Sequence, residues 1–357
     1  MMAVLKAKTP KVWRMGVHSP DASGSSQLTV DLAQLKDFRF LILSVHAQAL
    51  EPIGLPPYAG STFRGAFGRA LKRAVCVMED QDCAVCAARE GCPYEYVFNT
   101  PVPVSTRRMR KYTAVPHPFL LDTGWVEEQE LDAGAEFSFD LTLIGEACAY
   151  LSYFVHSFEL LGRRFGLGRG RGKFRVTAVC NKETGGGETV LYAPPAVSFL
   201  PRNIQLQDGY SLAQGATAVG RKARILRVQF LTPCRLVAND RLAGTPTFRT
   251  LISSLLRRLS NLSYFHCGVE LDLPFKELLG VAEQVKLVDC QVRWHDWERY
   301  SARQQTKMRL GGLLGSAVYS CDFGFGLFLP LLKLGEVVHV GKGTSFGLGK
   351  LSVEAGL

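Results

Sequence analysis

The stretch HVGKGTSFGLGKLSV at residues 339–353 contains four glycines, and its Phe-Gly-Leu-Gly at 346–349 occurs a second time at 165–168. Each copy is followed by a basic residue, Arg169 in the first and Lys350 in the second. Each copy also stands between a segment with the apolar pattern of a buried helix and a segment rich in strand-forming residues. A motif that returns after 181 residues, about half the chain, indicates an internal duplication.

The order of elements around the two motifs is the same in both halves: strand, helix, strands, helix, glycine loop, strand. The first half opens with a strand at 38–50 and a helix at 61–75, and the second half with a strand at 221–237 and a helix that Thr247 can cap. The β-α-β-β-α-β order is that of the ferredoxin-like unit, which RNA-recognition sheets also use. We therefore predict an α+β fold of two tandem ferredoxin-like (RRM-like) domains with glycine-rich loops.

The domain limits follow from composition. Residues 1–36 are mixed in composition and contain SPDASGSS, so we expect a loosely held arm. The N-terminal domain is predicted at 37–215, with a four-cysteine insertion at 76–92, and the C-terminal domain at 216–357. Residues 181–220 carry turn residues throughout and are expected to connect the two halves.

Charge indicates the class of partner. The chain has 42 Lys and Arg against 32 Asp and Glu, a net charge of +10, which favours a polyanion such as nucleic acid. No run of 18 apolar residues is present, and the first residues lack the apolar block of a secretion signal. We expect a cytoplasmic protein that is not embedded in a membrane.

The glycine loops can present backbone amides to an anion because no side chains obstruct them. Both loops follow helices and lead into strands, which is the reverse of Rossmann and Walker loops, so a mononucleotide site is disfavoured. A flexible hairpin without a ligand is the alternative. Against it, 163–175 holds six cations and no acid, a charge density that is costly unless a polyanion is near. The predicted contacts to RNA in this segment are Arg164, Arg169, Arg171 and Lys173.

Four cysteines form a cluster with the spacing Cys-x6-Cys-x2-Cys-x5-Cys: Cys76, Cys83, Cys86 and Cys92. The central Cys-x2-Cys can present two thiolates to one tetrahedral ion, and short loops can bring the outer pair. We predict a structural zinc site; an iron–sulfur cluster and unligated thiols are the alternatives. Four sulfur ligands leave no open position, so such a metal would take no part in catalysis.

The motifs together resemble a known family. The helix FRGAFGRAL at 63–71, the segment WERYSARQQTKMRLGGLLG at 297–315 and the stretch at 339–353 are similar to those of CRISPR-associated repeat-processing endoribonucleases of the RAMP superfamily. The resemblance implies two ferredoxin-like domains with CRISPR precursor RNA bound in a positive cleft between them. It also implies one metal-independent cut in each repeat, in which the ribose 2′-hydroxyl attacks the adjacent phosphate and leaves a 2′,3′-cyclic phosphate. Mature guide RNA, and further CRISPR effector subunits, are then partners.

In-line attack by a 2′-hydroxyl needs a base, an acid and cations, and His and Lys suit these roles near neutral pH. The family usually carries a catalytic histidine in or just after its first helix, and 61–75 contains none. His339, beside the glycine loop, is the first choice here, with Lys342 and Lys350 to stabilise the phosphate; a hydrogen-bonded strand-end histidine is the alternative reading of His339. His46, on the first strand, is the second choice.

Other residues are predicted to contact RNA through phosphate or backbone. Trp294 or Trp297 could stack on a base, although core packing is equally compatible with both indoles. The residues predicted to contact the RNA backbone lie in an Arg-rich hairpin, the first helix and the second glycine loop. They are Arg299, Arg303, Lys307, Arg64, Arg69, Gly341, Gly343, Phe346, Gly347, Gly349 and Lys350. A non-catalytic RAMP-type subunit that holds guide RNA would share these features and is the alternative function.

Overall fold

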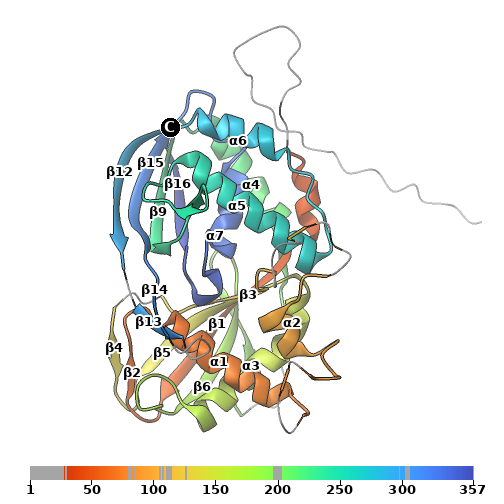
Figure 1. Cartoon of the computed structure of the whole chain (residues 1–357), viewed down its shortest axis with the longest axis vertical. Helices are drawn as coiled ribbons and strands as arrows, with labels where there is room; N and C mark the ends of the chain where they lie inside the picture. Colours follow the sequence, from red (N-terminus) through yellow and green to blue (C-terminus); the bar gives the residue numbers. More distant parts are fainter. Residues whose placement is uncertain are drawn as a thin grey trace, which may run out of the picture.

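The computed structural model describes residues 28, 30–78, 82–83, 85–103, 106, 108–109, 115–124, 127–195, 203–296, 298–301 and 306–356, with the backbone alone for 298–301 and 306–309. Two sheets follow one another along the longest axis of the molecule. The N-terminal sheet is in the lower half of Figure 1 and the C-terminal sheet is in the upper half. No helix of the described residues is long and apolar enough to cross a membrane.

The N-terminal sheet has the strand order β3-β5-β1-β6-β7, with β8 paired to one end of β1, and its pairings are antiparallel. β1 lies at its centre, where Leu43 is opposite Leu141 of β5 and Asn181 of β6. The strands are β1 Arg39–Ala49, β3 Phe119–Asp122, β5 Glu136–Ile144, β6 Phe174–Lys182, β7 Glu188–Tyr192 and β8 Gln207–Asp208. A small separate sheet pairs β2 Ile53–Leu55 with β4 Gln129–Leu131.

Two helices pack against each other and carry the core of this domain. In α1 (Gly60–Val75), Phe67 stacks on Phe154 of α3 (Leu151–Leu160), with ring centroids 5.0 Å apart. This confirms the helix predicted at 61–75, whose apolar residues recur at helical spacing. The other helical segments are η1 Leu32–Asp37, α2 Pro93–Asn99, η2 Gly145–Tyr150 and the π-helical η3 Leu161–Phe165.

The C-terminal sheet has the order β12-β15-β9-β16 and is also antiparallel. Its elements are β9 Ile225–Cys234, α5 Phe248–Leu262, β12 Lys286–His295, β15 Gly312–Ser320, α7 Leu329–Val338 and β16 Leu351–Gly356. As predicted, Thr247 caps α5, because its hydroxyl accepts the N–H of Thr250. Smaller elements are β10 Val237–Ala238, β11 Arg241–Leu242, η5 Ser263–Cys267, α6 Phe275–Glu283, β13 Glu298–Ser301, β14 Thr306–Arg309 and η6 Thr344–Phe346.

The two domains share one topology. When the strands of each β-α-β-β-α-β unit are numbered in chain order, both sheets run 2-3-1-4, with β1 and β9 as first strands and β6 and β16 as fourth strands. The predicted fold class, two tandem ferredoxin-like domains, is confirmed.

The loops that carry the Phe-Gly-Leu-Gly repeat make a similar backbone contact in both domains. In each, the loop before the fourth strand lies against the chain just after the first strand: the N–H of Arg169 donates to the carbonyl of Gly54, and the N–H of Lys342 donates to that of Arg235. A Cβ on Gly168 would lie 2.2 Å from the oxygen of Gly54, and φ there is +70°. Glycine at this position therefore allows two backbones to meet.

A hydrophobic core continues across the junction of the domains. Phe40, Leu120 and Ile144, at the ends of β1, β3 and β5, are buried together with the core of the C-terminal domain. His266 of η5, which has no exposed surface, donates from Nε2 to the carbonyl of Pro116 at 2.7 Å and accepts the hydroxyl of Tyr96 at Nδ1. These contacts fix the relative position of the domains.

Two expectations about organisation differ from the structure. Residues 30–36, assigned to a loose arm, are packed: Leu32 and Leu35 of η1 are buried in the C-terminal core. The predicted boundary at 215/216 falls inside a helix, α4 (Gly209–Lys222), which lies against α7. Its glycines and polar residues suggested turns, whereas burial of Ala213, Ala216 and Gly220 against neighbouring elements stabilises the helix.

Candidate functional site

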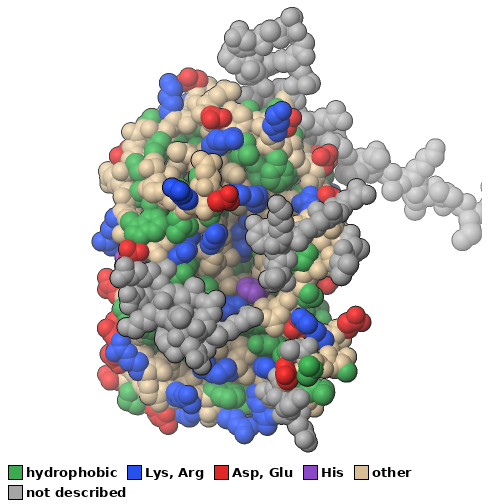
Figure 2. Space-filling view, in the orientation of Figure 1, with side chains coloured by type: hydrophobic (Ala, Val, Ile, Leu, Met, Phe, Trp, Pro, Cys, Tyr) green, Lys and Arg blue, Asp and Glu red, His purple; other side chains and the backbone are tan. Residues whose placement is uncertain are grey.

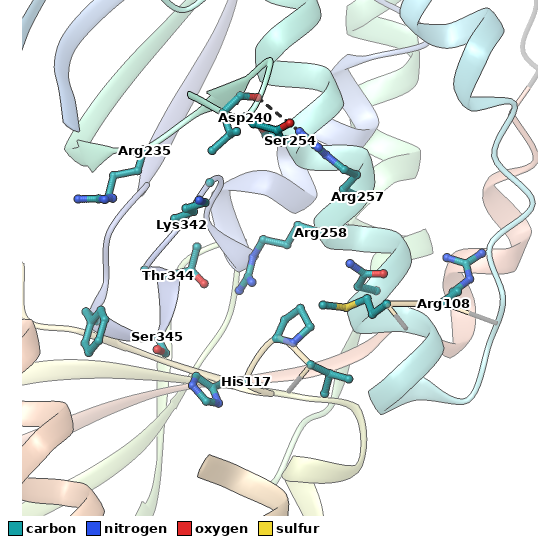
Figure 3. Close-up of a pocket in the computed structure, with 18 residues that line it drawn as sticks. Arg108, His117, Arg235, Asp240, Ser254, Arg257, Arg258, Lys342, Thr344 and Ser345 are labelled. Atoms are coloured by element: carbon teal, nitrogen blue, oxygen red, sulfur yellow. Dashed lines mark hydrogen bonds between the residues drawn. The ribbon is translucent and has the colours of Figure 1, made fainter. Parts of the chain in front are cut away.

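A pocket of about 750 Å³ lies where the two domains meet. Figure 2 shows a hollow in the middle of the molecule with Lys or Arg side chains and one histidine at its surface. Figure 3 shows the lining side chains converging from α5, the second glycine loop and the chain before β3. The lining residues are Arg108, Met109, Val115, Pro116, His117, Arg235, Val237, Asp240, Ser254, Arg257, Arg258, Asn261, Gly341, Lys342, Gly343, Thr344, Ser345 and Phe346.

The pocket is strongly basic. Five of its lining side chains are cationic, namely Arg108, Arg235, Arg257, Arg258 and Lys342, and one, Asp240, is a carboxylate. Such a concave surface of one sign concentrates anionic ligands. Its volume also suits a ligand of nucleotide size.

Most of these arginines already make contacts within the protein. Arg108 pairs with Glu270, at 2.8 Å between Nη2 and Oε1, and lies over the ring of Tyr264. Arg235 donates to the carbonyl of Gly311, and Arg257 donates to the carbonyl of Ser253. These contacts hold the guanidinium groups around the pocket.

Arg258 is the most deeply buried of the five cations. It is 8% exposed, its Nε donates to the carbonyl of Val338 at 2.6 Å, and its Nη2 has no hydrogen-bond partner among the described residues. Burial lowers the pKa of its guanidinium to about 9. The protein therefore holds a desolvated positive charge at the wall of the pocket.

His117 lies at the floor of the pocket, directly before β3 (Figure 3). Arg64 of α1 donates from Nη2 to Nε2 of His117 at 2.8 Å, so the ring proton is on Nδ1. Burial, together with the charges of Arg64 and Arg258, lowers the pKa of His117 to about 3. The imidazole is therefore neutral at physiological pH.

His339, the first predicted catalytic residue, is 4% exposed at the C-terminal end of α7. Its Nδ1 donates to the carbonyl of Leu348 at 3.2 Å, across the base of the glycine loop. Burial lowers its pKa to about 4, although Asp122 acts in the opposite direction. It does not line the pocket, and its contact corresponds to the alternative reading of a histidine hydrogen-bonded in place.

The second glycine loop reaches the pocket with its first part. Gly341, Lys342, Gly343 and Phe346 line the pocket, and the side chain of Lys342 is exposed. The remaining predicted contacts of this loop, Gly347, Gly349 and Lys350, make contacts within the protein. Gly347 packs on the backbone of β3, and Gly349 donates to the carbonyl of Pro233.

The first glycine loop does not line this pocket. Arg169 pairs with Glu128 at 2.7 Å, and Nζ of Lys173 donates to the carbonyl of Arg164. Arg164, Arg169 and Arg171 are exposed. The glycines of this loop hold it against β2, so its cations remain a separate basic surface whose contact with RNA stays a prediction.

His46, the second catalytic choice, lies away from the pocket on the N-terminal sheet. Its Nε2 is 3.4 Å from Oε2 of Glu188, and with Cys180 these side chains form the group of three possible metal ligands that the described residues bring within 4.8 Å of one another. Of these three side chains, Cys180 is buried, His46 is half-buried and Glu188 is exposed.

The remaining predicted RNA contacts have varied positions. Arg64 lies beneath the pocket with its guanidinium over the rings of Phe98 and Phe346, and Arg69 is exposed on α1. Arg299 and Lys307 lie on the paired strands β13 and β14, but their side chains are outside the described part, and Arg303 lies outside the described residues. Trp294 is 41% exposed and donates from its indole to Asp296.

The four cysteines lie between α1 and α2, and all four are partly buried. Among the described residues, their sulfur atoms do not form a group of three within 4.8 Å. Zinc binding by this segment stays a prediction.

Most residues of the pocket were not selected from the sequence, among them His117, Arg257 and Arg258. A signal for Arg258 was present, because it is spaced seven residues after Leu251 and three after Leu255, on the apolar face of α5. A cation at a core position of an amphipathic helix indicates a special role. His117, between two prolines, carried no comparable signal.

Comparisons with known proteins agree with this organisation. Residues 228–351 match the family described as CRISPR-associated endoribonuclease Cas6, and residues 38–203 match a family described as an N-terminal domain. The resemblance to CRISPR repeat-processing endoribonucleases that the sequence motifs indicated is confirmed. An uncharacterized protein of Archaeoglobus fulgidus is 24% identical over 303 residues, which is 83% of this chain and 91% of that protein.

Solved structures support the fold. The structure of Cas6 from Thermus thermophilus is similar with a TM-score of 0.51 and 15% identity, over 89% of this chain and 99% of that one. A partial complex of a Cas6-RT-Cas1 protein with Cas2 is similar with a TM-score of 0.54 and 13% identity, over 90% of this chain and 46% of that one. At these identities the likeness concerns the arrangement of the two domains.

Proposed function

We propose that this protein is an endoribonuclease that binds CRISPR precursor RNA and cleaves it within each repeat to give guide RNA. The observation that carries the proposal is the basic pocket between two ferredoxin-like domains, lined by the glycine loop of a segment that matches the Cas6 endoribonucleases. Its cations come from both domains, so one RNA chain lying across the junction would contact both.

The reaction proposed is internal transesterification. The 2′-hydroxyl loses its proton as its oxygen forms a bond to the adjacent phosphorus, and the bond from phosphorus to the 5′-oxygen breaks. The products are a 2′,3′-cyclic phosphate and a 5′-hydroxyl, whose oxygen takes up a proton. Base, acid and cationic groups of a protein are sufficient for these steps, so we propose that no metal ion takes part.

Among the described residues, His117 and Lys342 are best placed to act at the phosphate. His117 is the neutral histidine of the pocket, and it can accept a proton at Nε2 once bound RNA draws the guanidinium of Arg64 away from that nitrogen. Lys342 is an exposed cation on the opposite wall and can stabilise charge on phosphorus or supply a proton to the 5′-oxygen. His339 instead connects the two ends of the glycine loop.

Two observations favour a second function, a non-catalytic subunit that holds guide RNA in a CRISPR complex. α1 carries no histidine, and the pocket histidine is bonded to Arg64, which lowers its basicity. Such a subunit would bind repeat RNA in the same pocket without cutting it. Assembly with other CRISPR proteins is a proposed property of either function.

The test uses purified protein, labelled repeat RNA and a chelator. Cleavage of the all-ribose repeat, with a cyclic phosphate on the upstream product and no cleavage of a repeat that carries a 2′-deoxyribose at the scissile position, supports the enzyme. Binding without cleavage supports the guide-RNA subunit. Cleavage of the 2′-deoxy repeat at the same bond would contradict the proposed chemistry.

A further inference from the structure

We propose that the pocket contains a subsite for a single phosphate group, held by the guanidinium of Arg258 together with Lys342 and the hydroxyls of Thr344 and Ser345. The inference rests on the proposed function in one respect: RNA would supply the phosphate. It goes further because it assigns one buried residue of α5 as the anchor of that phosphate.

The first step is the state of Arg258. Its side chain is more than nine-tenths buried. Nε donates to the carbonyl of Val338, and Nη2 has no partner among the described residues. A buried charge without a counterion is strongly disfavoured, and buried charges in proteins are ordinarily paired. The partner that would satisfy Nη2 is an acceptor, and an anion would also supply the counterion.

The second step is that the protein itself supplies no counterion. Burial and the charge of Arg258 both lower the pKa of three histidines, His117, His266 and His339, so all three are neutral. The buried carboxylate nearest to His339, Asp122, is paired with Lys350. Asp240 lies at the other end of the pocket, beside Ser254 (Figure 3). No ion pair of Arg258 occurs in the described part of the chain.

The third step is the geometry of the donors. Figure 3 shows the Arg258 side chain pointing from α5 into the pocket, toward the side where Thr344 and Ser345 stand and above His117. Thr344 and Ser345 are buried hydroxyl residues of η6, and Lys342 is on the same loop. A phosphate has oxygens in several directions, so it can accept from a planar guanidinium and from hydroxyls at once.

Arg258 also differs from the other arginines of the pocket. Arg108 has Glu270 as a counterion, and Arg257 has two backbone carbonyls as acceptors. Because Arg108 and Arg257 already have partners, they contribute to the positive potential of the pocket and need no ligand to complete their hydrogen bonds. One phosphate bound against Arg258 would therefore be the tightly held one, with its neighbours along the RNA held more loosely.

The experiment measures inorganic phosphate binding to the full chain by calorimetry and by thermal unfolding at low salt. We expect phosphate to raise the midpoint of wild type. We expect Arg258→Met to lose this shift and to weaken phosphate affinity at least about tenfold. Without phosphate, the midpoint of Arg258→Met should equal or exceed that of wild type, because the variant removes a buried charge.

Arg249→Met is the matched control, since Arg249 is on the same helix and pairs with Glu283 outside the pocket. It should keep the full phosphate response. Lys342→Ala, an exposed loop residue, provides a second variant if Arg258→Met does not fold, and it should weaken phosphate binding several-fold. A dinucleoside monophosphate and a nucleoside 3′-phosphate, used as competitors, distinguish an internal phosphodiester from a terminal phosphate.

A lower midpoint for Arg258→Met together with unchanged phosphate affinity would overturn the subsite and leave Arg258 a structural role. The outcome is independent of cleavage. If wild type binds phosphate through Arg258 but does not cut repeat RNA, the subsite stands and the proposed enzyme fails. If wild type cuts RNA and neither cutting nor phosphate binding changes in Arg258→Met, the enzyme stands and the subsite fails.

Discussion

The ammonium of Lys350 lies 2.5 Å from Oδ2 of Asp122, and this ion pair joins the second glycine loop to β3 of the other domain. Asp122 is 8% exposed and its Oδ1 accepts the N–H of Gly124. Burial raises the pKa of this carboxyl, but the positive charge beside it and the hydrogen bonds from Lys350 and Gly124 outweigh that effect and the pKa is lowered. Lys350, predicted to contact RNA, therefore holds the domains together.

The first prediction concerns this pair. Lys350→Met leaves a buried carboxylate without its counterion and should lower the free energy of unfolding by about 2–3 kcal/mol. Asp122→Asn combined with Lys350→Met should recover part of the loss, because no charge is then left buried. Urea unfolding of the two variants measures the difference; equal stability of Lys350→Met and wild type would show that the pair contributes nothing.

The second prediction concerns the contact between α1 and the glycine loop. A Cβ on Gly60 would lie 1.9 Å from the carbonyl oxygen of Phe346, so Gly60→Ala should displace the loop and destabilise the protein by about 1–3 kcal/mol. Gly65 is on the same helix with open space around it, and Gly65→Ala should stabilise by up to about 1 kcal/mol. Thermal unfolding of both variants tests this, and the same sign for both would contradict it.

Much of the fold could be predicted because the signals are local. The strands of β1 and β9 and the helices α1 and α5 follow from apolar periodicity, and the repeated motif revealed the duplication. The helix α4 could not be predicted, since its glycines and polar residues favour turns and it is stabilised by packing on the distant α7 and η1. The packing of η1 likewise depends on the distant C-terminal core.

The site was less predictable because it lies between domains. Residues of the glycine loop could be selected from the motif, and Lys342 does line the pocket. The motif could not show that Lys350 would meet Asp122, which is 228 positions away in the chain. Nor could it show that His117 would lie beside Arg64 of α1, at the helix in which a family-type histidine is missing.

The third prediction separates the two candidate histidines. His117→Ala should lower the rate of RNA cleavage about 10²-fold with little change in RNA affinity, since general acid–base catalysis contributes on that order. Added imidazole should restore part of the rate. His339→Ala should instead lower the unfolding midpoint, because it removes the hydrogen bond to Leu348. Unchanged cleavage by His117→Ala would eliminate that residue as acid or base.

The fourth prediction concerns pH. Burial lowers the pKa of His266 and of His339 from 6.5 to about 4, so between these values the unfolded chain binds more protons than the folded one. Stability from keeping them neutral is complete above pH 6.5 and is lost as the pH falls toward 4. Each group should cost about 2 kcal/mol at pH 5 relative to pH 7.5.

Urea unfolding at the two pH values measures this loss. His266→Gln is the control, because it should show a smaller difference between the two pH values than wild type does. A free energy of unfolding that is constant from pH 7.5 to 5 would contradict the assignment of neutral, buried histidines.

The fifth prediction concerns the four cysteines. We expect one zinc ion per chain after dialysis against a weak chelator, and its removal should lower the unfolding midpoint. Since we propose a cleavage reaction without a metal ion, cleavage should continue in protein that remains folded. Cys83→Ser combined with Cys86→Ser should abolish zinc binding. Two controls identify the ligands. Cys290→Ser replaces an exposed cysteine of β12, and Cys180→Ser replaces the cysteine among the possible metal ligands His46, Cys180 and Glu188. Loss of the metal in Cys180→Ser alone would move the site to the N-terminal sheet, because that thiol would then supply the required ligand.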